Sequence, residues 1–311
     1  MFYFLLHFIF VFFLLFSDNL HADDKKKIIT YEVGKPYKIK KKWYYPKNDL
    51  NYNEIGIASV NTKKKDTKTK NGEIFSNTRV LAKHNTLALP TIVRVTNLKN
   101  GYAINVRIND RGPKNNFRII ELSKKTANYL KIENKALVNV KVISDLSIQE
   151  QNNIKRNEVS KYTNDNLEKN VALGKEKVES ENLLTNKNKK KEEIKEFIQI
   201  DATNKKKLKL NFRKITIEPY YLRINITKFR KFKDASELKI KMKPIYDKIL
   251  ISLGLFDGQK YYKVTTVPVR NLNEAEYILK VIHKKGFNNA KLFIENKKKW
   301  LIFIKNFFYY F

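Results

Sequence analysis

An alternating strand that runs straight into a rigid turn constrains the fold of this chain most. Residues 103–108 alternate with a period of two, and Asn109-Asp110-Arg111-Gly112-Pro113 follows at once. The alternation predicts a β-strand with one buried face, and Gly and Pro favour a turn after it. Such a strand end would hold Asp110 rigidly while leaving it open to other molecules. On composition alone, a turn-forming Asp without chemistry is the simpler interpretation.

Residues 54–143 are rich in β-strand patterns. The segment 91–98 predicts a second strand, joined to the first by Asn100-Gly101, the dipeptide favoured in two-residue hairpin turns. Ser123 fits the N-cap of a short helix that turns Ala127 and Leu130 inward. A last alternating strand would hold Val138, Val140 and Val142. We therefore expect a compact β-domain here.

Residues 145–214 differ in composition from both flanks. Asn, Lys and Glu dominate, apolar residues are sparse and no period persists. Such a stretch cannot bury enough apolar surface to offset its ordering entropy, so the composition predicts a disordered linker.

A second ordered domain is expected between residues 215 and 299. Strands at 222–226, 261–267 and 290–295 alternate with two helical patterns, which predicts a βαββαβ sheet with both helices on one face. Asp234 with Glu237, and Asn273 with Glu276, fit capping boxes. Pro244 should end the first helix. The second should bury Ala275, Ile278, Leu279 and Ile282 and end at Gly286-Phe287.

The N-terminus indicates export. Phe2 to Phe16 is apolar but short for a bilayer span, and the following residues fit cleavage after Ala22. Since no Lys or Arg precedes the apolar run, an uncleaved membrane anchor is the alternative. Residues 23–53, basic and aromatic, are expected to form an arm over the β-domain, and the aromatic tail 300–311 fits either an added strand or an interfacial segment.

Composition limits the chemistry. The formal charge of +33 fits either a polyanionic partner or a general bias towards Lys and Asn. Without Cys there is no disulfide, thiol nucleophile or Cys-based metal site. The four His, at positions 7, 21, 84 and 283, lack metal-ligand spacing. We expect no metal and no cofactor.

Several motifs in one order resemble a known family. They are Gly56-Ile57-Ala58-Ser59, Asn71-Gly72-Glu73, Ala82-Lys83-His84, the strand at 93–98, Asn109 to Pro113 and Arg118 to Ser123. Together they resemble the six-stranded double-psi β-barrel of the rare lipoprotein A (RlpA-like) family, over residues 54–144. The family's lipid attachment cannot occur here, because no Cys follows the apolar run.

The resemblance implies a lytic transglycosylase. Such an enzyme cleaves the β-1,4 bond between N-acetylmuramic acid and N-acetylglucosamine without water, and the 6-hydroxyl of the muramic acid attacks its own anomeric carbon. The resemblance assigns the role of acid and then base to Asp110, which needs a raised pKa. Because Arg107 and Arg111 would lower that pKa, we expect at least one of them to face solvent, glycan hydroxyls or another carboxylate.

The resemblance also suggests roles for five other residues. Glu73 would share the cleft and stabilise the anomeric centre, and His84 is a further catalytic candidate. A solvated loop Glu and a structural His are the alternatives. Ser59, Thr69 and Arg111 would bind substrate.

Three departures from the resembled pattern cluster near the expected cleft. Val60-Asn61-Thr62 replaces an aromatic pair and a Gly, 63–68 replaces a Gly-containing loop, and Ser76 replaces an Asp. Ala82-Lys83-His84 also stands where the family shows Ala-Ala-His. Losing aromatic rings would weaken stacking on sugars.

The C-terminal domain resembles the SPOR module, which binds glycan strands stripped of their peptides. The matching residues are Tyr261 to Val264, Asn273 to Glu276 and Lys285 to Phe287, whereas Val267-Pro268-Val269 departs from the usual Gly-Pro-Phe. Joined to the barrel by a long tether, such a module would raise the effective concentration of glycan.

Three functions follow from these patterns. The first is a periplasmic, septal lytic transglycosylase that acts on peptidoglycan glycan strands and has possible division-protein partners. The second is an inactive wall-binding protein of the same architecture. The third is a nucleic-acid-binding protein, in which Tyr221 and Tyr262 would stack on RNA bases; the export signal argues against it. Contact with a membrane is expected only if the N-terminal segment stays uncleaved.

Overall fold

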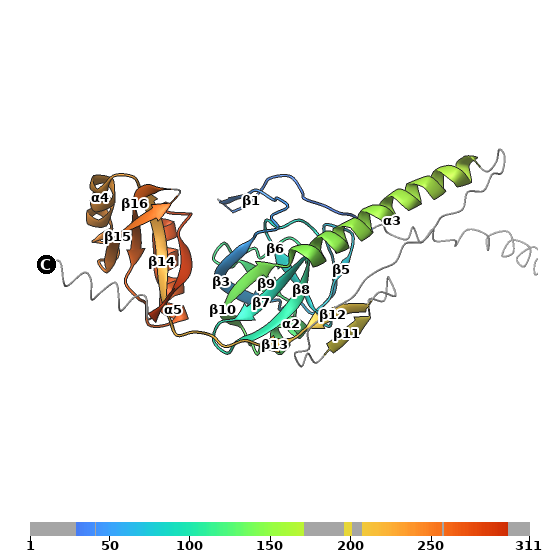
Figure 1. Cartoon of the computed structure of the whole chain (residues 1–311), viewed down its shortest axis with the longest axis horizontal. Helices are drawn as coiled ribbons and strands as arrows, with labels where there is room; N and C mark the ends of the chain where they lie inside the picture. Colours follow the sequence, from blue (N-terminus) through green and yellow to red (C-terminus); the bar gives the residue numbers. More distant parts are fainter. Residues whose placement is uncertain (1–28, 41, 171–195, 201–206, 257, 298–311) are drawn as a thin grey trace, which may run out of the picture.

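The computed structural model describes residues 29–40, 42–170, 196–200, 207–256 and 258–297. It forms two bodies, a barrel and a smaller C-terminal module (Figure 1). The predicted signal segment 1–22, the tail 300–311 and residues 171–195 of the predicted linker lie outside the described residues. Within the described part of the chain, no helix is both long and apolar enough to cross a bilayer.

Six strands close into a barrel. Their order is β8-β6-β9-β3-β10-β7, and pairing of β7 with β8 closes the ring. Pairing is antiparallel except between β6 and β8 and between β3 and β9. The strands are β3 (Asn53–Val60), β6 (Leu81–His84), β7 (Thr91–Asn97), β8 (Tyr102–Asp110), β9 (Ile120–Leu122) and β10 (Lys135–Val142). The predicted six-stranded barrel is confirmed.

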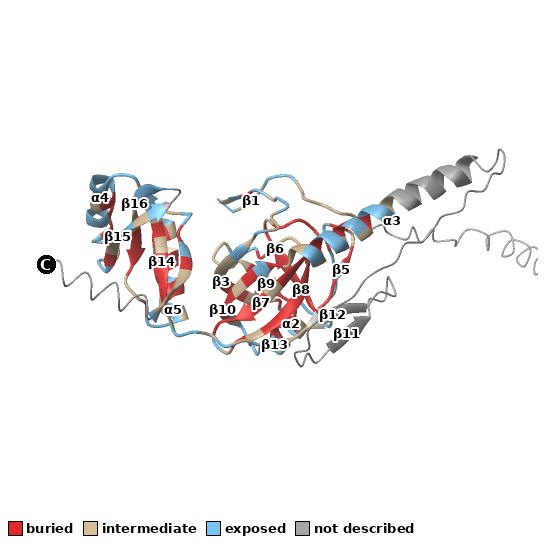
Figure 2. Cartoon of the chain, viewed as in Figure 1, coloured by how far each residue is buried: buried red, intermediate tan, exposed pale blue. Residues whose placement is uncertain are grey.

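The barrel core follows from the alternation. Ile104, Val106 and Ile108 of β8 are fully buried and pack with inward residues of the other strands. Figure 2 shows this buried interior inside the ring. The residues between them on β8, among them Arg107 and Asn109, point outwards. One face of each strand thus builds the core, and on β8 the other face carries polar groups.

The β7–β8 turn differs from the prediction. The last paired residues are Thr96 and Ala103, and Gly101 N–H donates to Asn97 O at 2.8 Å. Gly101 has φ +77°, whereas Asn100 does not take a positive φ. The predicted two-residue turn is wrong, and residues 98–101 form a longer loop. In this loop the Asn100 side-chain oxygen accepts a hydrogen bond from Tyr102 N. A Cβ at Gly101 would lie 2.0 Å from Ile215 O, so the close approach requires glycine.

Helix α2 (Lys124–Tyr129) begins as predicted. Ser123 is its N-cap, and the Ser123 hydroxyl accepts a hydrogen bond from Thr126 N at 3.1 Å. Ala127 and Leu130 are buried in the barrel core.

The N-terminal arm lies against the barrel. It holds the hairpin of β1 (Tyr37–Ile39) and β2 (Lys42–Tyr44). Thr30 N–H donates to Asn71 O at 2.9 Å, and Glu32 pairs with Leu89. A second small hairpin, β4 (Thr67–Lys68) and β5 (Ile74–Phe75), encloses the turn that carries Glu73. Arm and hairpin together border the end of β8.

The predicted disorder of residues 145–214 does not hold throughout. Helix α3 (Ser144–Asn170) leaves the barrel as a long rod (Figure 1). The Ser147 hydroxyl and the backbone of Ile92 hydrogen-bond each other, and Gln151 donates to Pro90 O at 3.1 Å. Polar contacts anchor this helix, so the search for apolar periodicity missed it.

Three further strands lie in the same segment. β11 (Glu196–Ile200) pairs with β12 (Lys207–Asn211), and β13 (Arg213–Lys214) pairs with β8 at the rim of the barrel. The chain therefore returns to the barrel before it enters the C-terminal module.

The module has the predicted βαββαβ order. It consists of β14 (Tyr220–Phe229), α4 (Phe232–Met242), β15 (Ile249–Phe256), β16 (Gln259–Thr266), α5 (Leu272–Lys284) and β17 (Lys291–Asn296). The strand order is β15-β16-β14-β17, and all pairs are antiparallel. Buried residues of both helices share one core with Leu222, Ile224 and Ile226. One face of the sheet is covered by helices, as expected.

Both predicted capping boxes are wrong. Helix α4 has Lys231 as its N-cap, with no hydrogen bond from a capping side chain, and Asp234 lies in its first turn. Helix α5 is capped by Asn271, which accepts from Glu274 N at 3.0 Å. Each helix begins before the N-cap residue that the sequence predicted. Several polar side chains near each helix start could serve as the N-cap, so spacing alone does not identify the right one. The ends agree with the prediction: α4 stops before Pro244, and Gly286 has φ +98°.

Glu276 instead joins the module to the barrel. Its carboxylate lies 2.9 Å from the Arg118 guanidinium and 2.5 Å from Lys135 Nζ, both on the barrel. Lys291 bonds Glu54, and Ile57 and Leu137 join the core of the module. The two bodies thus share an interface with an apolar centre and charged pairs around it.

This interface should weaken in acid. Burial alone would raise the pKa of Glu276, but hydrogen bonds from Lys135, Lys280 and Arg118 lower it to about 2. Because the folded pKa is depressed, the stabilisation is present above about 4.5 and is lost as pH falls towards about 2. The protection of amides at the interface between α5 and the barrel, measured by hydrogen exchange and corrected for the intrinsic exchange rate at each pH, should therefore fall between pH 5 and pH 3.

Glu276→Ala should open the same interface at neutral pH, with Glu237→Ala on the exposed face of α4 as the matched control. Equal exchange in both variants and in the wild type would contradict an electrostatic contribution from Glu276.

Candidate active site

Asp110 ends β8 on the outer surface of the barrel, as the sequence predicted. Its side chain is 13% exposed. Lys83 Nζ lies 2.9 Å from its Oδ2, and the backbone N–H of Lys70 donates to Oδ1 at 3.3 Å. The same ammonium lies 4.4 Å from the centre of the Phe75 ring. Asp110 is thus accessible and held from two sides.

Both neighbouring arginines turn away from Asp110. Arg107 binds Glu73 and Glu150, while Arg111 donates to the backbone carbonyls of Leu87 and Val33. Since Arg107 faces carboxylates, the expectation for these two residues is confirmed.

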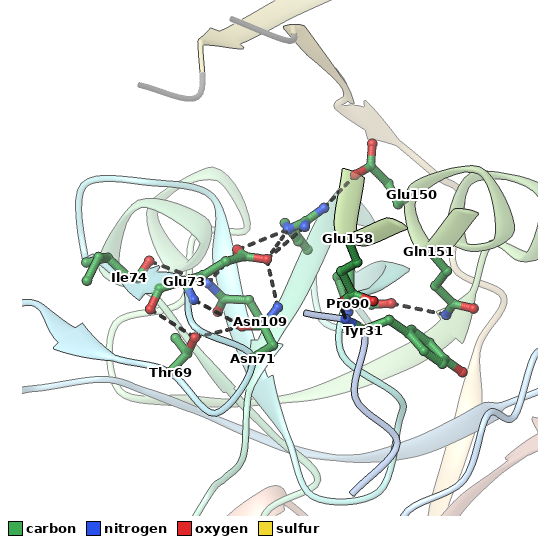
Figure 3. A network of polar contacts seen from close by, with 11 residues as sticks. Tyr31, Thr69, Asn71, Glu73, Ile74, Pro90, Asn109, Glu150, Gln151 and Glu158 are labelled. Carbon is green, nitrogen blue, oxygen red and sulfur yellow. Dashed lines mark hydrogen bonds and ion pairs between the residues drawn. The ribbon is translucent and has the colours of Figure 1, made fainter. Parts of the chain in front are cut away.

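Glu73 lies buried in a polar network beside this site (Figure 3). Arg107 Nη2 lies 2.7 Å from its Oε1, Asn71 donates to Oε1 at 2.8 Å, and Asn109 donates to Oε2 at 3.1 Å. Burial raises the pKa of Glu73, but the charge and hydrogen bonds of Arg107 outweigh it, with help from both amides, and the pKa is lowered. Glu73 is therefore held as the anionic partner of Arg107.

Glu73 and Asp110 are linked through one turn. Asn109 reaches Glu73, and Asp110 follows it directly across an irregularity in the pairing of β8 with β6. On the other side, the amide of Lys70 reaches Asp110 while Asn71 reaches Glu73. The structure thus brings two of the predicted catalytic residues to one place. The Oδ1 atom of buried Asn109 is left without a hydrogen-bond partner among the described residues.

Thr69 holds this turn. Its hydroxyl donates to Asn71 Oδ1 at 2.7 Å and contacts Glu73 O at 3.0 Å, and the residue is buried. These contacts make Thr69 a support for Glu73, so the expectation that it binds substrate is not supported.

His84 is the last residue of β6 and directly follows Lys83. It is buried, and its Nδ1 accepts the backbone N–H groups of Thr86 and Leu87 at 3.2 and 3.1 Å. Its Nε2 therefore carries the proton and donates to the Tyr52 hydroxyl at 3.0 Å. Burial lowers the pKa of His84 to about 3, and the Arg111 charge adds to this. In this structure His84 is neutral and holds the β6–β7 loop, and its catalytic role stays a prediction.

His84 should not titrate near neutral pH. We expect its ring NMR signals to stay constant between pH 5 and pH 8. Because its folded pKa lies below the usual 6.5, the unfolded chain binds the extra proton, and stability should fall as pH drops below about 6.5. Denaturant unfolding at pH 7 and pH 5 checks the sign, and His84→Asn should reduce the slope. A His84 signal that titrates near pH 6.5 would contradict this account.

Arg111 also has a structural place. It donates to Val33 O at 2.6 Å and to Leu87 O, and burial lowers its pKa. Gly34 lies so close to the Arg111 side chain that a Cβ atom at position 34 would be 3.3 Å from Arg111 Nη2. Arg111 ties the N-terminal arm to the β6–β7 loop, and the prediction that it binds substrate is not supported.

Ser59 belongs to a row of polar residues across the outer face of the barrel. It is half-buried on β3, where it pairs with Glu121 on β9 and with Lys135 on β10. Glu121 pairs with Lys83 on β6, and Lys83 pairs with Asp110 on β8. Residues in register project from the same face of a sheet. Ser59 thus lies on the surface that carries Asp110.

Sequence reasoning missed Lys83 and Glu121. Glu121 stands between Ile120 and Leu122, and Lys83 follows Ala82, so each marks the outward position of a strand. The sequence alone does not show which strands are neighbours, so it could not predict that these two outward residues share a surface with Asp110.

The departures from the resembled pattern also have structural roles. Asn61 is buried and its N–H donates to Leu122 O, while Ser76 hydrogen-bonds Thr78. The lysines at 63–65 are exposed. The loop that lost aromatic residues therefore presents charge beside the site.

A separate cavity of about 510 Å³ lies at the other end of β8. Its lining includes Tyr102, Tyr129 and Phe212, together with Lys125 and Lys131. The three rings pack on one another, so we assign no chemistry to this cavity. Among the described residues no group of three or more His, Cys, Asp or Glu could hold a metal ion.

Comparison with known proteins agrees with this geometry. A family model described as "Lytic transglycolase" matches residues 42–142, which is the barrel with part of the arm. A protein of Rickettsia bellii named "Endolytic peptidoglycan transglycosylase RlpA" is 36% identical over 158 residues, which cover 49% of this chain and 69% of that protein. The chain belongs to the RlpA family. A protein of the same name from Rickettsia felis is 41% identical over 116 residues, or 36% of this chain.

The similarity does not extend over whole RlpA proteins. The chain spans about half the length of the Rickettsia felis relative, 51%, and 36% of the one from Rickettsia typhi. The "Crystal structure of RlpA SPOR domain from Pseudomonas aeruginosa" aligns with 23% of this chain and 96% of its own at 19% identity, with a TM-score of 0.22. At that score we rely on the topology of the module itself.

Proposed function

We propose that the barrel is a lytic transglycosylase that cleaves the glycan strands of peptidoglycan at Asp110 and leaves 1,6-anhydro-muramic ends. The observation that carries this proposal is the place of Asp110: outward on a rigid strand end, partly exposed and beside a second fixed carboxylate. The reaction needs one proton delivered to the leaving oxygen and one taken from the 6-hydroxyl.

Glu73 contributes a fixed negative charge next to this site. Three donors hold its carboxylate, and its lowered pKa keeps it ionised. A preorganised anion can stabilise the positive charge that develops on the sugar in an oxocarbenium-like transition state. Glu73 therefore acts through charge and does not transfer a proton.

The module would bind the glycan strand, preferably one without peptides, on the sheet face that the helices leave open. Arg223 lies there, bonded to Glu295 at 2.5 Å and close to the Phe293 ring. Asn225 on the same face has a buried Oδ1 without a partner among the described residues. Aromatic and amide groups together suit a sugar chain with hydroxyl groups.

Such an activity suits a protein of the periplasm, where peptidoglycan lies, that acts at the septum during cell-wall remodelling and daughter-cell separation. Septal division proteins would then be its partners. Family membership supports the cell-wall substrate.

An inactive wall-binding protein is the second candidate. Two features favour it. The Lys83 ammonium forms an ion pair with Oδ2 of Asp110, and the loop at 63–65 presents charge where the family pattern has aromatic residues nearby. Both candidate functions imply binding to peptidoglycan, but only the enzyme would release fragments with anhydro-muramic ends.

Digestion of purified peptidoglycan separates the two candidates. The mature chain should release fragments with anhydro-muramic ends, detected by mass spectrometry, from intact and from peptide-stripped glycan. Heat-denatured protein is the control. Binding to the glycan without such fragments would leave the wall-binding protein, and fragments with reducing ends would indicate hydrolysis instead.

A further inference from the structure

Three charged residues lie in register on neighbouring strands beside the site. Asp110 on β8 pairs with Lys83 on β6, and Lys83 pairs with Glu121 on β9. Partners across a sheet project from the same face. Lys83 therefore stands between two carboxyl groups on the outer face of the barrel.

The Lys83 ammonium binds only one of these two carboxyl groups. It lies 2.9 Å from Asp110 and packs on the Phe75 ring, and its side chain is only 9% exposed. It makes no ion pair within 4 Å of Glu121 in the described structure. A charge-assisted hydrogen bond stabilises the carboxylate form of its partner. Lys83 is thus the ion-pair partner of Asp110 and not of Glu121.

Glu121 has the opposite properties. It is half-buried, and no described residue hydrogen-bonds its carboxyl group. Burial raises the pKa of Glu121, and Asp110 acts in the same direction, while Lys83, Lys63 and Lys114 oppose it. The group is protonated more often than an ordinary Glu and is free to meet a ligand.

We propose that Glu121 is the proton donor of the cleavage and that Asp110, held by Lys83, is the proton acceptor. This inference rests on the transglycosylase activity proposed above. The Glu121 carboxyl gives its proton to the leaving oxygen as the bond from that oxygen to the anomeric carbon breaks. The 6-hydroxyl oxygen bonds to the anomeric carbon, and its proton passes to Asp110. Exchange with water then returns Glu121 to the acid and Asp110 to the carboxylate.

The spacing of the two carboxyl groups fits this division of roles. Neighbouring strands lie about 4.8 Å apart, so residues two strands apart have Cα atoms about 10 Å apart. Carboxyl pairs that flank a glycosidic bond in glycosidases lie roughly 5 to 9.5 Å apart. Asp110 acts to raise the pKa of Glu121, so the two carboxyl groups lie close enough to influence each other.

The test compares Glu121→Gln with Asp110→Asn on two substrates. One is purified peptide-free glycan, and the other is a muramyl glycoside with a 4-nitrophenol leaving group, which needs little help from an acid. Glu121→Gln should lower kcat on glycan by about 10²- to 10⁴-fold and change cleavage of the nitrophenyl substrate less than tenfold. Asp110→Asn should lower both. The alkaline fall of kcat/KM on glycan, where Glu121 ionises, should be absent with the nitrophenyl substrate.

Glu133→Gln, at an exposed carboxyl of the barrel, is the matched control, and Glu121→Asp keeps the acid should the Gln variant fail to fold. Glu121→Asp should retain part of the activity on glycan. Equal losses on both substrates, or none on glycan, would overturn Glu121 as donor. A wild type that cleaves neither substrate would overturn the proposed activity itself.

Discussion

Asp110→Asn should reduce release of anhydro-muramic fragments by at least about 10²- to 10⁴-fold, the usual contribution of a positioned acid or base. Asn keeps the size of the side chain and a donor and an acceptor, but it can neither carry the charge that holds Lys83 nor take a proton. Because Lys83 is buried and Asp110 is only 13% exposed, the loss of this ion pair should also lower the free energy of unfolding, so circular dichroism should first confirm that the variant is folded.

The matched control for Asp110→Asn is Asp66→Asn, an exposed carboxylate in the loop beside the site. Initial rates of fragment release, quantified by mass spectrometry at equal protein concentration, are the measurement. Binding of both variants to peptidoglycan should equal that of the wild type. If Asp110→Asn released fragments at the wild-type rate, Asp110 would have no part in the chemistry, and any activity would belong to another site.

Arg107→Met should lower the free energy of unfolding by about 3–5 kcal/mol, the cost of leaving a buried charge without its partner. Arg107 is buried and bonds both Glu73 and Glu150, so its loss leaves the Glu73 carboxylate with only two amides. The burial that Arg107 now outweighs would then raise the pKa of Glu73. Denaturant unfolding at pH 7 measures the loss.

The double variant Arg107→Met with Glu73→Gln tests the cause. Removing both charges should restore most of the lost stability, because no buried ion then lacks a partner. Glu73→Gln alone should also destabilise, since it leaves the Arg107 guanidinium with Glu150 only. A single Arg107→Met variant as stable as the wild type would show that water reaches Glu73, and its assignment as a fixed buried anion would be wrong.

Sequence reasoning recovered most of the fold because periodicity reports on the faces of strands and helices. The inward residues of β8, the stripe on α5 and the N-cap Ser123 all followed from local patterns. Helix α3 was missed because Ser147 and Gln151 anchor it through hydrogen bonds to a distant strand. The turn at Gly101 was misjudged because its geometry depends on the approach of Ile215.

The site was predicted less completely. The strand, the Asp and the Gly-Pro turn predicted where Asp110 lies, but the catalytic roles of both Asp110 and Glu73 came from the family resemblance. Whether a side chain faces ligand or backbone depends on residues far along the chain, as the contacts of His84 and Arg111 show. Lys83 and Glu121 became visible only when three strands were set in register.

The return of β13 to the rim of β8 decides which part of the chain spaces the module from the barrel. Helix α3 is anchored on the barrel at Ser147, and β13 pairs with β8, so the chain is fastened to the barrel both before and after residues 171–195. Residues 215–219 join β13 to β14. The length of this short connection, together with the contacts of Glu276, therefore sets how far the module lies from Asp110.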